Sequence, residues 1–171
     1  KRNKRSIAIV WIDLKNAFGS VKHNLIQYAL SHYYVPPKVR EIIHCYYENL
    51  SVLVQKPLTL SFRYGVGVFQ GCPLLRIHIN ICFQILLDSL ERTPLRALGY
   101  CFKDGGVKAS NTGFADDLAV ISNRRDGAQK KLETIDQYLS WSGMRSAPHK
   151  CRAYAAKLCA NKYAPYDPGL T

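Results

Sequence analysis

A short apolar run that stops at an acidic residue constrains the fold of this chain more than any other feature. The run, Ser6 to Ile12 (SIAIVWI), is rich in β-branched and apolar residues, and Asp13 follows it directly. Runs of this length and composition are typical of a strand that is buried on both faces. We therefore expect other elements to pack around this strand, with Asp13 at its end.

Helical and strand patterns alternate along the rest of the chain. Helices are expected after a capping Ser20 over residues 21–33, then over 38–49, from Pro73 to about Leu90, and over 126–141, where Gly143 ends the pattern. Strands are expected in a hairpin over 51–64, at 100–103 and 107–122 in the same sheet, and near 151–158. This mixture predicts an α+β fold, with helices on one side of a mainly antiparallel sheet.

The composition fits a single globular domain with a polyanionic partner. The chain has 171 residues, of which 47% are hydrophobic and 21% charged, so a multi-domain enzyme is excluded. Its 24 Lys and Arg residues exceed its 12 Asp and Glu residues, which gives a net charge of +12. This excess favours a partner such as nucleic acid, although a basic domain without such a partner has the same charge.

Membrane, zinc and disulfide classes are not indicated. The most apolar stretch, residues 74–90, contains too many polar side chains to span a membrane. The six cysteines have no CxxC or other paired spacing, so we expect reduced thiols and an intracellular location, in the nucleus or the cytoplasm. The sequence begins with KRNKR and has no apolar signal region, which suggests a segment of a longer polypeptide.

Adjacent Asp116 and Asp117 form a second acidic site beside apolar residues. No Lys or Arg lies within five residues of the pair on either side. Because neighbouring carboxylates repel and unpaired buried ones are costly, a divalent cation would stabilise the pair, provided that the backbone turns between them. Asp13 is the candidate third ligand of a two-ion site for phosphoryl transfer, for which Mg²⁺ is suited. Acids of an exposed loop remain the alternative.

Four segments resemble, in order and spacing, the palm motifs of reverse transcriptases from non-long-terminal-repeat (LINE-type) retrotransposons. They are WIDLKNAFGSVKHNLI, GVFQGCPLLRIHINICFQILLD, FADDLAVI and SWSGMRSAPHKC. The resemblance covers about Ile7 to Arg152. It implies a polymerase palm with RNA-directed DNA polymerase activity, in which a primer 3′-hydroxyl attacks the α-phosphate of a dNTP and pyrophosphate leaves.

The resemblance also implies a set of metal ligands. Asp13, Asp116 and Asp117 would be the catalytic carboxylates that hold two Mg²⁺ ions, with Mn²⁺ as a substitute, and Asp117 would be the least direct ligand. The backbone carbonyl of Leu14 would also reach an ion.

Four further residues are implied to contact the nucleotide. Phe18 would lie beneath the sugar and select dNTPs, or else be a core residue at the start of a helix. Gln70 and Gly71 would contact the incoming nucleotide and the template, or else form an ordinary helix-entry loop. Lys150 would be a general acid for the leaving pyrophosphate, or else a solvated surface lysine.

Three other residues are interpreted as structural. His23 is expected to be a surface residue at the start of a helix rather than a ligand. Trp11 and Trp141 are expected in the core.

The sequence departs from the family pattern at two places. Gly19 stands where the family usually has a second Asp, and Leu75-Arg76 replaces the common Ser-Pro that opens the long helix. Two hypotheses therefore stay open: an active polymerase palm, and a catalytically decayed relic that retains the fold and nucleic-acid binding. An RNA-templated RNA polymerase is a third hypothesis, which Phe18 disfavours.

The domain and partner predictions follow from the same resemblance. Residues 1–158 are expected to form the palm with a partial fingers region, and residues 159–171 a tail that leads to a thumb absent from this sequence. The expected partners are an RNA template, a DNA primer, dNTPs and the remainder of a retrotransposon polyprotein, with no membrane.

Overall fold

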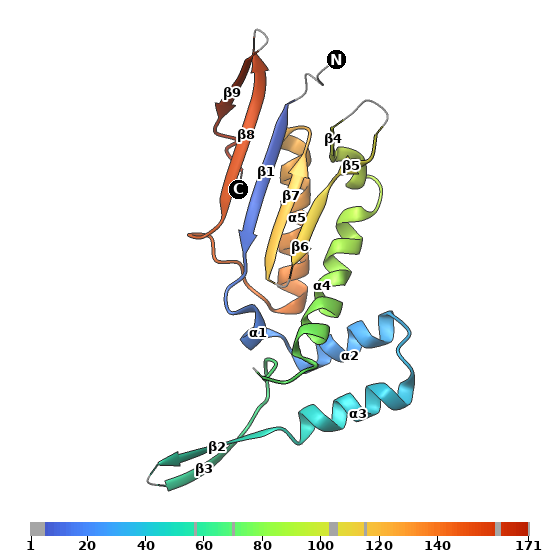
Figure 1. Ribbon diagram of the computed structural model, residues 1–171, viewed down its shortest axis with the longest axis vertical. Helices are drawn as coiled ribbons and strands as arrows, with labels where there is room; N and C mark the ends of the chain where they lie inside the picture. The colour runs from blue at the N-terminus through green and yellow to red at the C-terminus, as the bar shows by residue number, and fades with distance from the viewer. Residues whose placement is uncertain are drawn as a thin grey trace. The chain divides into compact units, whose positions relative to one another are not determined.

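The computed structural model describes residues 6–56, 58–69, 71–102, 106–114, 116–159 and 162–170. Figure 1 shows the helices and strands in chain order. The strands are β1 (Ile7–Asp13), β2 (Ser51–Lys56), β3 (Leu58–Arg63), β4 (Tyr100–Cys101), β5 (Lys108–Ala109), β6 (Asn111–Phe114), β7 (Asp117–Ser122), β8 (Arg152–Cys159) and β9 (Lys162–Tyr166). The helices are α1 (Ala17–Ser20), α2 (His23–His32), α3 (Pro37–Glu48), α4 (Leu75–Glu91), α5 (Arg125–Ser142) and the 3₁₀ helix η1 (Arg96–Leu98).

The chain divides into two compact units, and the division falls within α4. The first unit comprises Lys1–Lys15 and Phe83–Thr171, and the second comprises Asn16–Cys82.

A five-stranded antiparallel sheet forms the framework of the first unit. Its strand order is β6-β7-β1-β8-β9, so β1 lies at the centre. In β1, Ile12 is opposite Leu118 of β7, and Val10 is opposite Ala153 of β8. The predicted strand at the start of the chain therefore exists and is flanked by strands that come more than 100 residues later.

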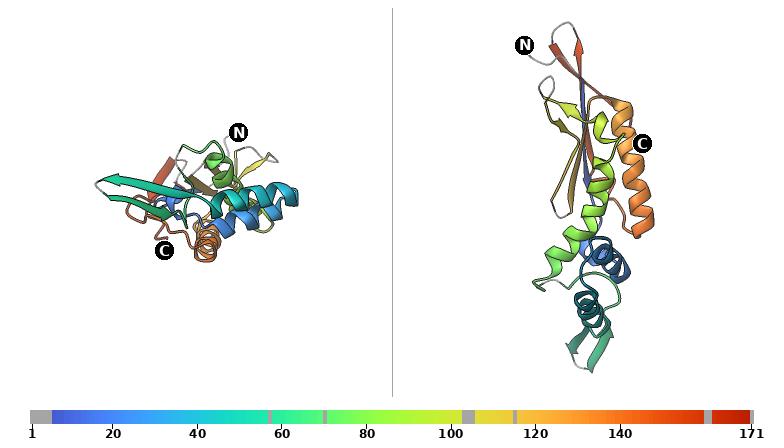
Figure 2. Two further views of the ribbon diagram at one scale, coloured as in Figure 1. Left: turned by 90° about the horizontal axis from the view of Figure 1, so that it is seen from below. Right: turned by 90° about the vertical axis from the view of Figure 1, so that its right-hand side faces the viewer.

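One face of this sheet is covered by α5. Val10, Ile12 and Leu118 are buried on that face, because side chains alternate along a strand. Figure 2 shows α5 lying along this side of the sheet, and Ile135 and Leu139 of α5 are buried.

The part of α4 in the first unit packs with α5. The ring of Phe83 in α4 lies 6.4 Å from that of Tyr138 in α5, measured between centroids. Near the other end of α4, Asn111 donates a hydrogen bond of 2.7 Å to Glu91. The predicted α+β architecture, with helices on one side of an antiparallel sheet, is confirmed.

The opposite face of the sheet is open, and this corrects two predictions. Trp11 of β1 points to this face and is 46% exposed, so β1 is buried on one face rather than on both. The described helices of the first unit pack on a single side, which leaves the side chains at odd positions of β1 accessible. Trp11 is therefore not a core residue, and Trp141, 52% exposed on α5, is not one either.

Several smaller expectations also differ from the structure. β4 pairs with β5 in a separate two-stranded sheet instead of joining the main one. β9 forms in the segment expected to be a plain tail, because it pairs with β8. The short helix α1 precedes α2, and the Ser20 hydroxyl bonds to the Ala17 carbonyl at 3.2 Å instead of capping α2.

Two packed helices and a hairpin make up most of the second unit. α2 buries Leu25 and Ile26, and α3 buries Ile43 and Tyr47. α3 starts at Pro37, where the missing N–H costs no helical hydrogen bond. β2 and β3 form the predicted hairpin.

The long helix α4 begins at Leu75 although the Ser-Pro pair of the family is absent. Arg76 is exposed on it. This departure from the family pattern therefore leaves the predicted element in place.

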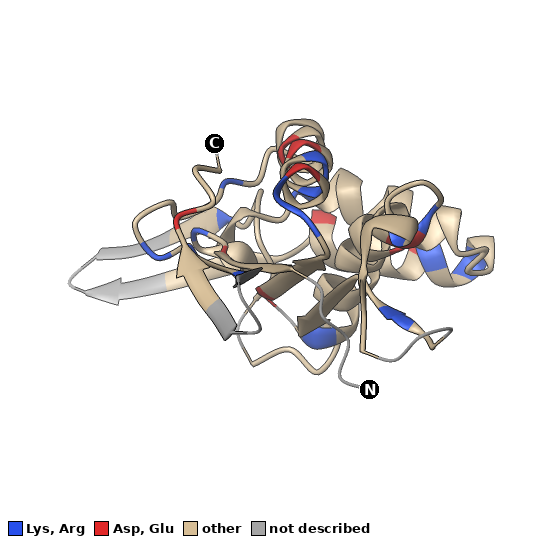
Figure 3. Ribbon diagram, turned by 90° about the horizontal axis from the view of Figure 1, so that it is seen from above, with Lys and Arg blue, Asp and Glu red and all other residues tan. Residues whose placement is uncertain are grey.

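Charged residues of both signs occur along α5, as the blue and red segments of its ribbon in Figure 3 show. Lys131 differs from its charged neighbours because it is fully buried. Its Nζ donates hydrogen bonds to Ser110 O at 2.8 Å, to Ser110 Oγ at 2.9 Å and to Ile121 O at 2.6 Å. The ammonium thus links α5 to β7 and to the residue that precedes β6. Among the described helices, none has both the length and the apolar character needed to cross a lipid bilayer.

Candidate active site

Two of the predicted carboxylates lie opposite each other on neighbouring strands. β1 ends at Asp13, β7 begins at Asp117, and the antiparallel register pairs these two residues. Directly opposed residues have Cβ atoms about 4.5–5.5 Å apart. Residues 104 positions apart in the chain therefore bring their side chains to the same edge of the open face.

Asp116 lies in the turn immediately before β7. The register pairs Phe114 of β6 with Asp117, and Asp116 lies in the turn between these two strands. The backbone thus turns at the acidic pair, as a shared ion would require. Asp116 is partly exposed and directly precedes Asp117 in the sequence.

A lysine partly offsets the negative charge at this edge. Lys150 Nζ lies 3.4 Å from Asp13 Oδ1, and the two side chains are 59% and 33% exposed. The contact is an ion pair without hydrogen-bond geometry, since Asp13 Oδ1 is itself buried and accepts no hydrogen bond. The site therefore contains a carboxylate oxygen that is removed from water and lacks a donor.

The segment after α5 brings Lys150 to the site. Lys15 N–H donates to Arg145 O and Ala147 N–H donates to Asp13 O, both at 2.8 Å. These two hydrogen bonds flank an antiparallel bridge between Leu14 and Ser146. In this bridge the carbonyl of Asp13 accepts a hydrogen bond and the carbonyl of Leu14 does not. This arrangement is compatible with the expected role of the Leu14 carbonyl as an ion ligand.

A cavity of about 470 Å³ lies at the carboxylates on the open face. Asp13, Asp117 and Lys150 line it together with Trp11 and Phe114. The two aromatic side chains are 46% and 83% exposed. The cavity thus combines carboxylates, an amine and accessible aromatic rings, which is a chemistry suited to phosphates and bases.

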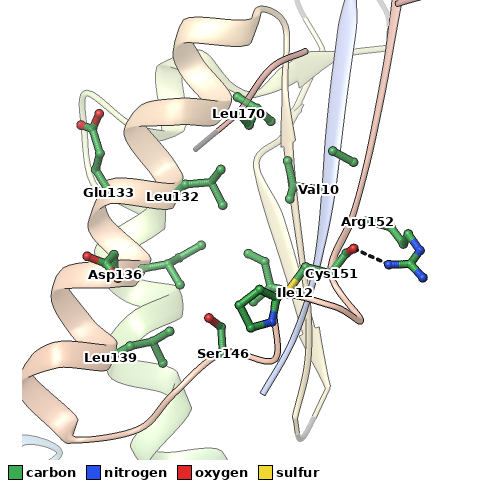
Figure 4. A pocket seen from close by; sticks show the side chains of 13 residues that line it. Val10, Ile12, Leu132, Glu133, Asp136, Leu139, Ser146, Cys151, Arg152 and Leu170 are labelled. Atoms are coloured by element: carbon green, nitrogen blue, oxygen red, sulfur yellow. Dashed lines mark hydrogen bonds between the residues drawn. The ribbon is translucent and has the colours of Figure 1, made fainter. Parts of the chain in front are cut away.

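A second cavity, of about 580 Å³, lies on the helix-covered side of the same sheet. Figure 4 shows Val10 and Ile12 facing Leu132 and Leu139 across it. Arg152 at its edge donates to the backbone carbonyls of His149 and Cys151, both at 2.8 Å. This cavity is mainly apolar, so we place the candidate active site on the open face.

The carboxylates fit a divalent cation in chemistry, but the described side chains do not form a finished metal site. Within the described residues, no three His, Cys, Asp or Glu side chains are arranged to hold an ion. Asp13 and Asp117 supply hard oxygen ligands, and the buried Asp13 Oδ1 lacks a donor. Mg²⁺ keeps several waters and takes other oxygens from substrate phosphates, so two or three protein carboxylates are sufficient for it.

The other predicted site residues belong to the second unit. Phe18 lies in α1 and is partly buried, and Gly71 is exposed with a φ of 99°. Gln70 lies outside the described residues.

His23 has a role that the sequence analysis missed. It was expected to be a surface residue, but its Nε2 lies 2.8 Å from the carbonyl oxygen of Gly67, and it is partly buried. The sequence gives no signal of this contact, because Gly67 lies 44 residues from His23.

Comparisons with known proteins give the family. The sequence model described as "Reverse transcriptase (RNA-dependent DNA polymerase)" matches residues 1–162. The relatives include Pol polyproteins of R2 retrotransposable elements from Nasonia vitripennis (type 1) and Drosophila melanogaster (type 2, R2DM). The chain is 30% identical to the first over 153 residues and to the second over 149 residues, which covers 88% and 86% of this chain. It spans 14% of the length of each polyprotein.

Solved structures share the fold. A telomerase from Candida tropicalis, truncated from its C-terminal domain, matches with a TM-score of 0.64 and 14% identity, over 94% of this chain and 33% of that one. Telomerase from the same organism in complex with a fragment of telomeric RNA matches with a TM-score of 0.66 and 16% identity, over 91% and 27%. At these identities the likeness establishes the fold alone.

Proposed function

The chain belongs to the reverse transcriptase family, and from this premise we propose that it forms the palm of an RNA-directed DNA polymerase within a retrotransposon polyprotein. The observation that carries the proposal is the strand register that sets Asp13 opposite Asp117 on the open face of the sheet. The proposed substrates are dNTPs, a DNA primer and an RNA template. The proposed partner is the remainder of the polyprotein, including a thumb after residues 159–171, and the proposed setting is intracellular.

Asp13, Asp116 and Asp117 are proposed to hold two Mg²⁺ ions, with Mn²⁺ as a substitute, and the Leu14 carbonyl is proposed to assist. The buried Asp13 Oδ1, which accepts no hydrogen bond, supports this assignment. When bound, such ions supply positive charge that favours ionisation of the attacking hydroxyl and offsets the charge of the phosphates. The carboxylates themselves would hold the ions at the end of β1 and the start of β7.

Lys150 is proposed to give a proton to the leaving pyrophosphate. The primer 3′-hydroxyl loses its proton to solvent as its oxygen forms a bond to the α-phosphorus, the bond from that phosphorus to the bridging oxygen breaks, and the released pyrophosphate takes a proton from Lys150 Nζ. The position of Lys150 Nζ, 3.4 Å from Asp13 Oδ1 at the edge of the site, supports this role.

Phe18, Gln70 and Gly71 are proposed to select and align the nucleotide. Phe18 would contact the sugar and exclude a ribose 2′-hydroxyl. Gly71 has no side chain and a positive φ, so its backbone can approach a base pair closely.

Primer extension tests the proposal. The full-length polypeptide that contains this chain is given an RNA template, a DNA primer, dNTPs and Mg²⁺. Extension is expected, and Asp13→Asn or Asp117→Asn should lower kcat at least about 100-fold, because each change removes an ion-binding charge. Asp136→Asn, an exposed carboxylate of α5 that lines the other cavity, is the matched control and should keep full activity.

Two results would contradict the proposal. Extension that persists in both site variants would remove the carboxylates from the mechanism. Primer–template binding without extension by the unaltered protein would leave the relic hypothesis, in which the fold and nucleic-acid binding are kept and turnover is lost.

A further inference from the structure

Two loop segments of the second unit are joined through their backbones. Gly67 N–H donates to Val21 O at 2.8 Å, and Val68 N–H donates to Phe18 O at 2.9 Å. Phe18 lies in the short helix α1 and Val21 directly follows it, whereas Gly67 and Val68 precede Gly71 in the loop before α4. The Phe18 backbone is thus held by a loop nearly 50 residues away in sequence.

Glycine at position 67 makes this close contact possible. Gly67 has a φ of 88°, a conformation that other residues rarely adopt. A Cβ atom there would lie 2.9 Å from Gly19 O and 3.0 Å from Gly19 Cα, both backbone atoms. The two segments therefore touch backbone to backbone, and small displacements of one are transmitted to the other.

His23 closes this junction from the side. Its Nε2 lies 2.8 Å from Gly67 O, and because a carbonyl oxygen only accepts, Nε2 carries the hydrogen and donates it. His23 begins α2, directly after the segment that holds Phe18 and Val21. Each polar backbone atom of Gly67 is thereby bonded to the Phe18–His23 segment.

The orientation of the His23 ring is itself fixed. The ring packs on Tyr47 with 4.3 Å between centroids and 31° between planes. Tyr47 is buried, and its hydroxyl lies 2.7 Å from Nδ1 of His78, which is also buried. Burial raises the pKa of Tyr47 and lowers the pKa of His78, so both rings stay neutral near pH 7. The orientation of the His23 imidazole is therefore set by its packing on the ring of Tyr47.

We propose that His23 is a positioning residue for nucleotide selection, which acts by holding the loop of Gly67 and Val68 against the Phe18–Val21 segment. This inference rests on the proposed function, because it assumes that Phe18 contacts the sugar of the incoming nucleotide. Loss of the His23 hydrogen bond frees the Gly67 carbonyl and loosens the junction. Phe18 then gains freedom to move away from a ribose 2′-hydroxyl, and discrimination against ribonucleotides falls.

The test measures the ratio of kcat/KM for a dNTP to that for the matching rNTP, by primer extension with the full-length polypeptide. This ratio does not depend on the fraction of correctly folded enzyme, so a partly misfolded variant still gives a valid result. His23→Leu removes the donor, and His23→Gln keeps an N–H at a similar distance from the backbone. His32→Leu makes the same chemical change at the exposed end of the same helix and is the control.

His23→Leu is expected to lower the ratio about tenfold, the effect of losing one hydrogen bond. His23→Gln should restore it to within about threefold of the unaltered protein, and His32→Leu should leave it unchanged. A ratio unchanged in an active His23→Leu variant would overturn the inference and spare the proposed function. Absence of extension by the unaltered protein would overturn both.

Discussion

At the scale of single residues, the main feature of the site is repulsion between two carboxylates. Asp13 and Asp117 place like charges on directly opposed strand positions, which destabilises a sheet. Lys150 offsets part of this repulsion at 3.4 Å, but both members of the ion pair are more than a quarter exposed, so solvent weakens it. The sequence alone indicates both acids, because each interrupts an apolar run. It does not indicate the ion pair, which depends on how residues 145–151 dock on the end of β1.

Lys150→Met should therefore affect activity far more than stability. Loss of a proton donor lowers kcat for primer extension by about 10²-fold or more, whereas loss of a solvent-exposed ion pair changes the free energy of unfolding by less than about 1 kcal/mol. Primer extension and urea unfolding measure the two effects. Lys157→Met, an exposed lysine of β8, is the control for charge. Equal activity of the two variants would show that Lys150 takes no part in catalysis.

At the scale of elements, the candidate site depends on how α5 holds the strands that carry it. Lys131 is buried in α5 and donates three hydrogen bonds to Ser110 and Ile121. Periodicity predicts the extents of α3, α4 and α5 and the β2–β3 hairpin, because these elements depend on local patterns. It does not predict the separate β4–β5 pair, the pairing of β9 or the open side of β1, because those depend on which distant segments pack together.

Lys131 should make stability depend on pH. Burial lowers the pKa of Lys131 to about 8, below the 10.5 of an exposed lysine. Between these values the unfolded chain binds more protons than the folded chain, so this group makes the free energy of unfolding rise with pH, by at most about 1.4 kcal/mol per pH unit. Lys131→Met removes the rise and also leaves its acceptors unpaired, which costs about 1–3 kcal/mol.

Urea unfolding at pH 7, 8 and 9 measures this difference. Burial raises the pKa of Cys82 to about 12 and also raises the pKa of Tyr47. These two groups make the free energy of unfolding fall with pH, opposite to Lys131. The informative quantity is therefore the difference in free energy of unfolding between the unaltered protein and the variant. Lys130→Met, the exposed neighbour on α5, is the control. The stability lost in Lys131→Met should grow from pH 8 to pH 9. A loss that is equal at all three pH values would refute the assignment.

At the scale of the whole molecule, the proposal of a nucleic-acid partner is based on net charge. A charge of +12 on 171 residues favours contact with phosphates whatever the local geometry. Charge and composition predicted this partner class, and the four motifs predicted the family that the comparisons establish. Neither the net charge nor the motifs predict the strand register that pairs Asp13 with Asp117, because the register depends on the packing of the complete sheet.

Binding to an RNA–DNA primer–template should weaken steeply with salt. Each phosphate contact releases condensed counterions, so the logarithm of the affinity should fall linearly with the logarithm of the salt concentration, with a slope of about −0.7 to −0.9 for each contact. Fluorescence anisotropy at several KCl concentrations measures the slope. A flat response would reject nucleic acid as the partner of this basic chain.

The account depends most on a divalent ion shared by Asp13 and Asp117. Metal-directed cleavage tests this without requiring turnover: Fe²⁺ replaces the bound ion, and ascorbate with peroxide generates radicals that cut the nearby backbone. The account predicts fragments that end near residues 13 and 117 and that disappear in Asp13→Asn/Asp117→Asn and in excess Mg²⁺. Absence of cleavage at these two strands, or cleavage that persists in the double variant, would contradict it.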